Sequence, residues 1–432
     1  MEQMHTFKKV IFSITGGDYM RDSSGTSKVV KAHEEIFTHA GYEYVVMFPI
    51  SLSRGTGAKR RTLTTGYYGL ALNGDFLGVY TKTQILKFLF EQQKSGNVIA
   101  GVLIHHVIRS RISEIKHIVE RIKHVKIVYY IHDFYTCCIN YNLLRNDETS
   151  CVGYMNMCKG CSYEALRSKH MADMASLFQL FEKDTLFIAP SAYVRERWLQ
   201  YYPQYAGNVI VISHQKSEGQ YEKNRDLIAR SNKVKVGYVG AQTKQKGWDL
   251  WNDILKRLPD AKDNYEFIYF GNGSEKLDGM KKVSVEIHRQ GKDAMIRALR
   301  MEKIDIVFLG SVCGETYSYT LFEAHASNCY ILAMETSGNI AYTVQHEDWG
   351  KVFRSSDDII AFLRNKEQVV DTLNAWKKET NPGAMRYIEN DEILKVFEDE
   401  ISGTVNYEHN ASAVITLFIR KMLSISYNMK RK

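Results

Sequence analysis

Two glutamates, Glu315 and Glu323, stand eight positions apart in a segment whose pattern could bring both carboxylates to one ligand. The apolar run 304–309 predicts a buried strand, the small residues after it predict a loop, and a helix is predicted to begin near Tyr317 or Ser318. Glu315 would lie just before this helix and Glu323 two turns into it. Free N–H groups at the helix start suit a diphosphate, and the carboxylates suit sugar and ribose hydroxyls.

A lysine–glycine pair, Lys246 and Gly247, follows the predicted strand 233–239. A lysine at the carboxyl end of a strand could neutralise a diphosphate, and the glycine would let the backbone approach it. Gly271 opens a Gly-Asn-Gly-Ser turn directly after another predicted strand, where a nucleotide could also bind. Each feature could instead serve the fold alone, as a surface lysine or a plain turn.

The first half of the chain offers a histidine and a glycine-rich loop. His132, followed by Asp133, ends the predicted strand 126–131, which is where a residue that contacts a ligand belongs. Gly17 lies between the first predicted strand and the first predicted helix, in a spacing that does not fit a dinucleotide fingerprint. Alternatively, His132 could serve only as a hydrogen-bond partner for a neighbouring loop. The pair at 105–106 is a weaker candidate of the same kind.

Five of the seven cysteines fall within 137–161, directly after His132. Cys158 and Cys161 form a Cys-x2-Cys pair, and Cys138 and Cys151 would complete four thiolate ligands for zinc. A zinc ion would fix this long insertion, whereas free thiols, a disulfide or an iron–sulfur cluster are the alternatives. No arrangement typical of a catalytic thiol is evident.

The elements that must position these residues alternate between short β-branched runs and longer amphipathic stretches, which predicts an α/β fold with parallel sheets wrapped by helices. A polar stretch at 213–231 divides the pattern in two. We therefore predict a first domain over 1–212, a linker, a second domain over 232–385, and C-terminal helices over 386–432 that return to the first domain. Two doubly wound, Rossmann-like domains would face a shared cleft.

Composition limits the class of protein. A chain of 432 residues is long enough for two domains, and its net charge of +8 is too small and too scattered to indicate a nucleic-acid partner. No apolar run predicts a membrane span or a signal peptide, so a cytoplasmic protein with reduced thiols is expected. The segment 411–432 joins apolar residues to a basic end. It predicts either a terminal helix packed on the core or a peripheral contact at the inner face of the membrane.

The two glutamates and their context resemble the E-x7-E motif of retaining glycosyltransferases of family 4, which have the GT-B fold. The resemblance implies that Glu315 contacts the transferred sugar and that Glu323 binds the nucleotide ribose. We also predict that Tyr317 and Ser318, at the start of the predicted helix, bind the donor. The loop before Lys246 and Gly247 is similar to the first loop of the family's second domain, although Ala241 replaces the usual arginine. His132 with Asp133 resembles the family's His-Asp pair. A subset of the family carries a similar cysteine-rich insertion, but with a proline where Ile139 stands here.

The resemblance implies a hexosyltransferase that needs no catalytic metal, because a lysine and a helix start stabilise the leaving diphosphate. The donor would be a UDP-, GDP- or dTDP-sugar, and the acceptor a glycan or lipid-linked glycan of cell-surface polysaccharide biosynthesis. Two alternatives remain open at this point. One is a nucleotide-sugar epimerase of the same fold, and the other is a catalytically inactive partner subunit stabilised by zinc.

Overall fold

The computed structural model describes residues 8–22, 24–54, 61–151, 158–181, 185–220, 226–258, 262–275, 279–379, 385–398, 403–407 and 424. The chain divides into two compact units, which are described separately. The first comprises Met1–Tyr141, Gly153–His214 and Asn390–Lys432, and the second comprises Asn142–Val152 and Gln215–Glu389. Within the described residues, no helix is both long and apolar enough to cross a bilayer.

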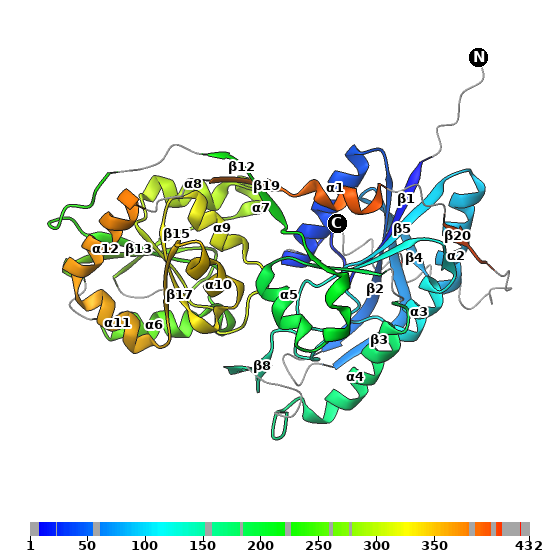
Figure 1. Ribbon diagram of the computed structural model, residues 1–432, viewed down its shortest axis with the longest axis horizontal. Coiled ribbons are helices and arrows are strands. Elements are labelled where there is room, and N and C mark those ends of the chain that lie inside the picture. The colour runs from blue at the N-terminus through cyan, green and yellow to red at the C-terminus, as the bar shows by residue number, and fades with distance from the viewer. Residues whose placement is uncertain are drawn as a thin grey trace, which may run out of the picture. The chain divides into compact units, whose positions relative to one another are not determined.

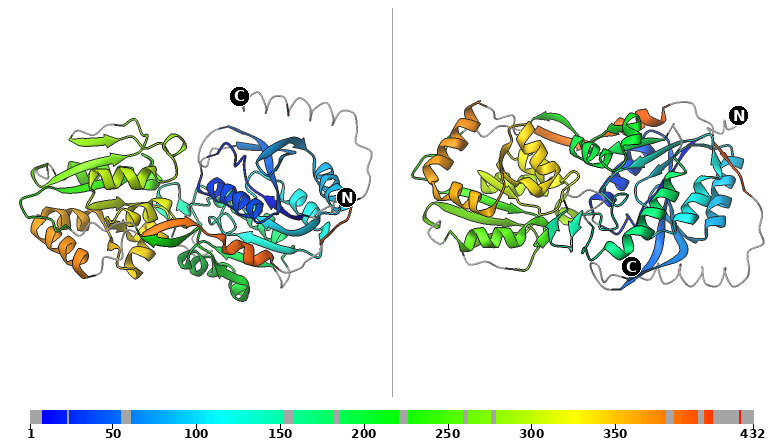
Figure 2. Two further views of the ribbon diagram at one scale, coloured as in Figure 1. Left: turned by 90° about the horizontal axis from the view of Figure 1, so that it is seen from above. Right: turned by 60° about the horizontal axis from the view of Figure 1, so that its bottom comes forward.

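The first unit is built on a sheet with the strand order β11-β10-β7-β5-β1-β2-β3-β4 among the described residues (Figures 1 and 2). Its parallel part consists of β1 (Lys9–Ile14), β2 (Glu43–Arg54), β5 (Val98–Ile104), β7 (Lys126–Tyr130), β10 (Leu186–Ala189) and β11 (Val209–Val211). β1 and β5 are buried along almost their whole length, as expected for central strands covered on both faces. Their carboxyl ends therefore meet at one edge of the sheet.

A hairpin extends this sheet in the antiparallel direction, which the sequence analysis did not predict. β3 (Arg61–Leu72) pairs with β2, and β4 (Asp75–Tyr80) pairs with β3. The turn between β3 and β4 is Asn73-Gly74, and both residues have positive φ, 50° and 85°. An Asn-Gly pair with this geometry is the preferred two-residue hairpin loop, because its twist matches that of the strands.

Helices of the first unit cover the sheet. They are α1 (Gly25–His39), α2 (Lys82–Lys94), α3 (Ile112–Val119), α4 (Glu164–Phe178) and α5 (Ala192–Leu199). Of these, α1, α2 and α5 begin with side-chain caps. The Ser24 side chain caps α1, and Thr81 forms a capping box with Gln84 at the start of α2. The 3-10 helix η6 (Asp391–Phe397) contacts α1, and its apolar residues belong to the same core cluster, so a C-terminal segment belongs to this unit (Figure 1).

The second unit is a doubly wound sheet with the strand order β15-β14-β13-β16-β17-β18 among the described residues, all of it parallel. The strands are β13 (Val234–Val239), β14 (Tyr265–Phe270), β15 (Met280–Val283), β16 (Ile306–Leu309), β17 (Tyr330–Met334) and β18 (Gly350–Phe353). The apolar and β-branched residues at 283–287 predict a strand, but the structure ends β15 at Val283 and begins the short helix α7 (Ile287–Gln290) after it.

Two apolar clusters cover the two faces of this second sheet. One joins the strands to α6 (Trp248–Lys256), α11 (Ser356–Arg364) and α12 (Lys366–Glu379), which lie together in Figure 1. The other joins them to α8 (Ala294–Glu302), α9 (Tyr319–Ala326) and α10 (Asn339–His346). Burial of both faces explains the continuous apolar runs of the strands.

Several short elements complete the description. They are β6 (Ile122–Lys123), β8 (Leu144–Arg145), β9 (Thr149–Ser150), β12 (Gln215–Gln220), β19 (Met385–Glu389), β20 (Thr404–Val405), η2 (Pro203–Asn208), η3 (Lys244–Lys246) and η5 (Glu335–Ser337). β12 pairs with β19 in the second unit, so the polar stretch predicted as a linker contains a strand. The predicted C-terminal helices correspond to β19, η6 and β20 over 385–405. The segment 411–432 lies outside the described residues except for Ser424.

Candidate functional site

The carboxyl ends of β13, β16 and β17 bring together the predicted residues Lys246, Gly247 and Glu315 in the second unit. Gly247 ends η3 with φ 81°, in the left-handed region. A Cβ atom at Gly247 would lie 2.0 Å from the carbonyl oxygen of Gly310, so the loop after β13 can approach the loop after β16 only because this residue is glycine. The Tyr238 hydroxyl lies 3.0 Å from the carbonyl oxygens of both Ala241 and Lys246, and its hydrogen bonding closes the first loop.

The loop that carries Glu315 is held by its backbone to the end of β17. The Glu315 N–H donates to Ser337 O at 3.3 Å, and the Asn339 N–H donates to Glu315 O at 2.8 Å. A Cβ atom at Gly338, which has φ 64°, would lie 2.7 Å from the Glu315 nitrogen. Glycine at 338 is thus required for the loops to meet, and their contact fixes the backbone of Glu315.

The carboxylate of Glu315 accepts hydrogen bonds from two neighbouring side chains on the same oxygen. The Lys246 Nζ–Oε1 distance is 2.6 Å, and Ser311 Oγ lies 2.8 Å from Oε1. The Cys313 Sγ, 3.9 Å away, is a weaker donor. The Glu315 side chain is 13% exposed and that of Lys246 46% exposed. Desolvation lowers the pKa of Lys246, but the charge and hydrogen bond of Glu315 outweigh it and the pKa is raised, so lysine stays protonated.

Ser311 is a functional candidate that the sequence analysis did not single out. Its side chain is buried, and its hydroxyl lies 2.8 Å both from the carbonyl of Gln245 and from Glu315 Oε1. It therefore links the loop that carries Lys246 to the predicted sugar-binding carboxylate. The sequence signal that could have identified Ser311 is its position directly after the predicted strand that became β16, in a run of small residues.

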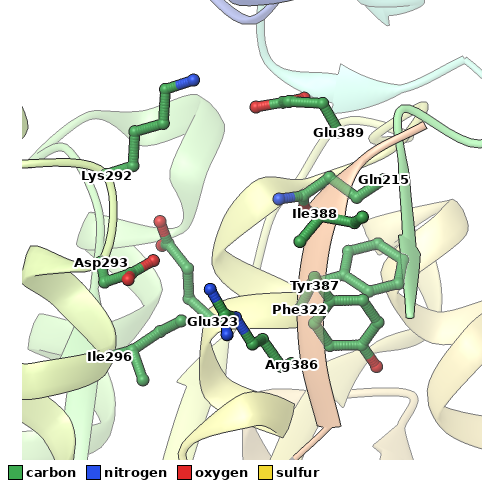
Figure 3. A pocket seen from close by; sticks show the side chains of 10 residues that line it. All are labelled: Gln215, Lys292, Asp293, Ile296, Phe322, Glu323, Arg386, Tyr387, Ile388 and Glu389. Carbon is green, nitrogen blue, oxygen red and sulfur yellow. The ribbon is translucent and has the colours of Figure 1, made fainter. Parts of the chain in front are cut away.

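Glu323 lies in α9 and lines a pocket of about 280 Å³ within the second unit. Figure 3 shows its carboxylate pointing toward Lys292 and Asp293, with the Arg386 guanidinium nearby. Gln215, Phe322 and Tyr387 are among the other lining residues. The pocket thus combines charged groups of both signs, an amide and aromatic rings.

Tyr317 and Ser318 lie between Glu315 and α9. Tyr317 is buried, stacks on Phe322 with 4.6 Å between ring centroids, and donates from its hydroxyl to Gln215 Oε1 at 3.4 Å. Tyr317 thus contacts two residues that line the Glu323 pocket. Ser318 has φ 70° and ψ 92°, outside the regions that serine prefers, and its side chain does not cap α9.

Gly271 follows β14 and packs on the loop after β13. A Cβ atom there would lie 2.9 Å from the carbonyl oxygen of Gly240, and one at Gly273 would lie 2.0 Å from Gln242 Oε1. The glycines of this turn therefore support the loop that leads to Lys246. Their predicted role beside a nucleotide stays a prediction.

Two of the predicted catalytic and donor-binding residues, Gly17 and His132, lie in the first unit. Gly17 follows β1, and a Cβ atom on it would lie 3.7 Å from the guanidinium of Arg109. His132 follows β7 and is 7% exposed. Its Nε2 lies 2.8 Å from Nδ1 of His105, and its ring stacks on Tyr130 with 4.5 Å between centroids. The catalytic role of His132 stays a prediction.

His132 belongs to a group of four buried histidines, which we call the histidine cluster: His33, His105, His132 and His214. Burial lowers the pKa of His33 to about 3, and burial with repulsion from His33 lowers that of His214 to about 3. Burial and the neighbouring histidines lower the pKa of the other two well below the usual value. All four rings are therefore neutral at pH 7.

The predicted zinc ligands are Cys138, Cys151, Cys158 and Cys161, and all four are partly exposed and form no disulfide. Cys151 belongs to the second unit and the other three to the first. In the part of the chain that the structure describes, no group of three or more His, Cys, Asp or Glu residues is arranged to hold a metal ion. The zinc site stays a prediction.

Comparisons with known proteins bear on the fold. No protein-family model and no curated protein matches the chain. Among solved structures, TarM aligns with a TM-score of 0.54 over 91% of this chain and 99% of TarM, at 9% identity. Sucrose-phosphate synthase from Thermosynechococcus elongatus gives 0.51 over 87% of this chain and 94% of that chain, at 13% identity.

WaaG, a glycosyltransferase involved in lipopolysaccharide biosynthesis, gives a TM-score of 0.50 over 87% of this chain and 95% of WaaG, at 14% identity. A further TarM structure, from S. aureus and with a TM-score of 0.51, contains UDP, α-GlcNAc-glycerol and fondaparinux. At these identities the likeness establishes the fold. The chain has the two Rossmann-like units of the GT-B fold, as its sequence predicted.

Proposed function

We propose that the protein is a glycosyltransferase that moves a sugar from a nucleotide-sugar donor to a glycan or lipid-linked acceptor with retention of configuration. The observation that carries the proposal is the ion pair between Lys246 and Glu315, held by two glycine contacts at the carboxyl edge of a doubly wound sheet. This edge is where such folds bind phosphorylated ligands. The GT-B fold is compatible with the proposal but does not by itself specify an activity.

Lys246 would stabilise the departing nucleoside diphosphate. Its ammonium has three donors, and one of them is engaged by Glu315, so further donors can turn to phosphate oxygens. Charge that develops on the leaving group would then be met by a positioned cation, in place of a divalent metal ion. Ala241 contributes no charge, so the proposal gives Lys246 most of this task.

Glu315 would contact the transferred sugar. Among the described residues, its recorded side-chain contacts all go to Oε1, from Lys246, Ser311 and Cys313. Oε2 is then the oxygen that can accept from a sugar hydroxyl or face the positive charge that develops on the sugar ring. Lys246 and Ser311 bind Oε1 and thereby fix the direction in which Oε2 points, while Oε2 keeps its capacity to accept a hydrogen bond.

Glu323 and its pocket would hold the nucleoside. A carboxylate accepts from the two hydroxyls of a ribose, and the rings of Phe322 and Tyr387 provide an apolar wall. The UDP in the TarM structure supports a uridine donor as the first choice to test. WaaG is involved in lipopolysaccharide biosynthesis, and by analogy with it we propose an acceptor in cell-surface polysaccharide biosynthesis. We also propose that the protein is cytoplasmic and lies at the inner face of the membrane.

Calorimetry with UDP, GDP, dTDP and CDP, in EDTA, tests the donor class. One nucleotide should bind without a divalent metal, and the matching nucleotide-sugar should be consumed when an acceptor glycan is present. Glu323→Ala should weaken nucleotide binding, whereas Glu315→Ala should abolish transfer and leave the nucleotide bound. Failure of all four nucleotides to bind would instead favour an inactive partner subunit, and consumption that yields free nucleotide without an acceptor would favour an epimerase.

A further inference from the structure

The pocket that contains Glu323 has an amide side chain, that of Gln215, among its charged and apolar walls. Gln215 begins β12 and is held in place by the β12–β19 ladder, where it pairs with Glu389. Its side chain extends from β12 into the pocket, opposite Lys292, Asp293 and Glu323 (Figure 3). An amide carries both donors and an acceptor, so it can distinguish ligands by their hydrogen-bonding pattern without attracting a particular charge.

The hydroxyl of Tyr317 fixes the direction of this amide. It donates to Gln215 Oε1 at 3.4 Å, so Oε1 faces Tyr317 and Nε2 faces away from it. Tyr317 is itself firmly held, because it is 3% exposed, stacks on Phe322, and accepts at its carbonyl from the Asn339 side chain at 3.0 Å. A rotation that exchanged the two ends of the amide would take away the acceptor that this hydroxyl has in Gln215.

The Nε2 group of Gln215 is the donor that the amide offers to a ligand. In the described part of the chain, the recorded side-chain hydrogen bond of Gln215 is the one at Oε1, and Figure 3 shows the nitrogen directed into the pocket. Gln215 is half-buried, so a ligand that fills the pocket would displace the water that otherwise accepts from Nε2. The ligand must then supply an acceptor, because a buried donor without one costs free energy.

The aromatic wall next to Gln215 provides a surface on which a planar base can pack. The rings of Phe322 and Tyr387 lie 5.0 Å apart between centroids, at 75° to one another, and the Tyr387 hydroxyl lies 2.6 Å from Nδ1 of the buried His325. A base that packs on such a wall presents its edge to the polar side chains around it. Because Glu323 lies across the pocket from Gln215, the ribose and the edge of the base can be contacted by different residues (Figure 3).

We infer that Gln215 is a specificity-determining residue that recognises the exocyclic group of the nucleobase and selects a carbonyl oxygen over an amino group. Uracil, thymine and guanine carry an oxygen at this position, whereas cytosine and adenine carry an amino group. The oxygen accepts from Nε2, but an amino group would bring one donor against another. The donor would then be a UDP-, dTDP- or GDP-sugar and not a CDP- or ADP-sugar. That the ligand in this pocket is a nucleoside rests on the proposed function.

Two pairs of nucleoside diphosphates isolate the exocyclic group. UDP and CDP share the ribose and the diphosphate, and they differ in the oxygen or amino group at C4 and in the proton on the neighbouring ring nitrogen. Inosine diphosphate and ADP differ in the same way at C6. Calorimetry measures the affinity of the full chain for all four in EDTA. In the pair whose ring size the pocket accepts, wild type should bind the carbonyl member about tenfold or more tightly than the amino member.

Variants of Gln215 test whether this residue makes the distinction. In Gln215→Glu the carboxylate can only accept, so the ratio of affinities should shift toward CDP or ADP by about tenfold or more. Gln215→Met should bind both members of the pair within about threefold of each other, since it offers neither donor nor acceptor. Tyr317→Phe should also weaken the preference, because the amide can then turn either end to the ligand. Gln345→Glu, at an exposed position of α10 outside the pocket, makes the same charge change and should keep the wild-type ratio.

The outcomes separate this inference from the proposed function. A wild type that binds CDP as tightly as UDP and ADP as tightly as inosine diphosphate would overturn the inference and leave the nucleotide site in place. The same conclusion would follow if Gln215→Glu kept the wild-type ratio. If Gln215→Glu does not fold, as its melting temperature would show, an unchanged ratio in Gln215→Met overturns the inference instead. A wild type that binds no nucleotide would refute the proposed function and the inference together.

Discussion

Lys246 and Glu315 form an ion pair, so on the proposed function a diphosphate would have to share the ammonium with the carboxylate. Removing the carboxylate charge should therefore strengthen diphosphate binding. We expect Glu315→Gln to raise affinity for the nucleoside diphosphate a few-fold and Lys246→Met to lower it by about tenfold, because the lysine is half-exposed and its interactions are partly screened. The double variant should bind like Lys246→Met.

Calorimetry with the nucleoside diphosphate that binds the wild type measures these affinities. Lys256→Met, at the far end of α6, is the matched control and should bind normally. The affinity for the corresponding nucleoside monophosphate should change less than that for the diphosphate in both Glu315→Gln and Lys246→Met. A Lys246→Met variant with wild-type affinity would show that the lysine does not contact the diphosphate.

Ser318 gives a second prediction at the residue scale. Its φ of 70° and ψ of 92° are strained for any residue with a Cβ atom. Ser318→Gly should relieve this strain and raise the free energy of unfolding by about 1 kcal/mol, measured by urea denaturation. Asp348→Gly is the control, because aspartate tolerates its φ of 53° and should gain less. If the free energy of unfolding rose equally in both variants, the proposed strain at Ser318 would be contradicted.

Packing of η6 on β5 gives a prediction at the scale of elements. A Cβ atom on Gly101 would lie 2.2 Å from the ring of Phe397, which is buried in the core of the first unit. Gly101→Ala should therefore displace η6 and destabilise this unit by about 1–3 kcal/mol, the usual cost of overpacking. Thermal unfolding followed by fluorescence would measure the loss. Gly207→Ala, where no atom lies within 4 Å of the new Cβ, should unfold like the wild type.

The cysteine-rich insertion carries the predicted zinc, for which metal content is the direct measurement. If the four thiols bind zinc, the purified protein should contain one zinc per chain. Cys158→Ser should then lower both the zinc content and the melting temperature. Cys329→Ser, at a buried cysteine of the second unit outside the cluster, should keep its zinc. A metal-free wild-type protein would exclude the site.

The sequence predicted the parallel strands well because they are buried on both faces and read as continuous apolar runs. The predicted strand 233–239 corresponds to β13 (Val234–Val239) to within one residue. The hairpin β3–β4 was missed because glycines interrupt the apolar runs of both strands, although the Asn73-Gly74 turn was a usable signal. The start of α9 was predicted within two residues, since a loop of small residues precedes it.

Side-chain partners could not be predicted to the same extent. Nothing in the spacing of Ser311 or Tyr44 shows that one contacts Glu315 and the other His105, since both contacts join segments far apart in the chain. Sequence patterns place residues at the edge of a sheet, but the loops decide which groups meet there. The approach of Gly247 to Gly310 is a contact of this kind.

At the scale of the whole molecule, the histidine cluster makes stability depend on pH. His33 and His214 have pKa values of about 3 when folded, against about 6.5 in the unfolded chain. Below pH 6.5 the unfolded chain therefore binds protons that the folded protein excludes. The contribution of the neutral histidines to the free energy of unfolding is fully present above pH 6.5. It is lost as the pH falls toward 3, by about 1.4 kcal/mol per pH unit for each histidine.

Melting temperatures between pH 7.5 and pH 4.5 test this dependence. The lower limit lies about two pH units below the pKa of histidine in the unfolded chain, which is far enough to detect the loss of stability. His33→Gln should melt at a lower temperature than wild type at pH 7.5, because it disturbs the core, but its melting temperature should fall less steeply with acid. His39→Gln, at an exposed histidine at the end of α1, should follow the wild-type slope. Because His33 Nδ1 is buried without a hydrogen-bond partner, protonating it would add an unpaired charge to the core. Identical slopes in all three proteins would mean that the cluster is protonated before the first unit unfolds.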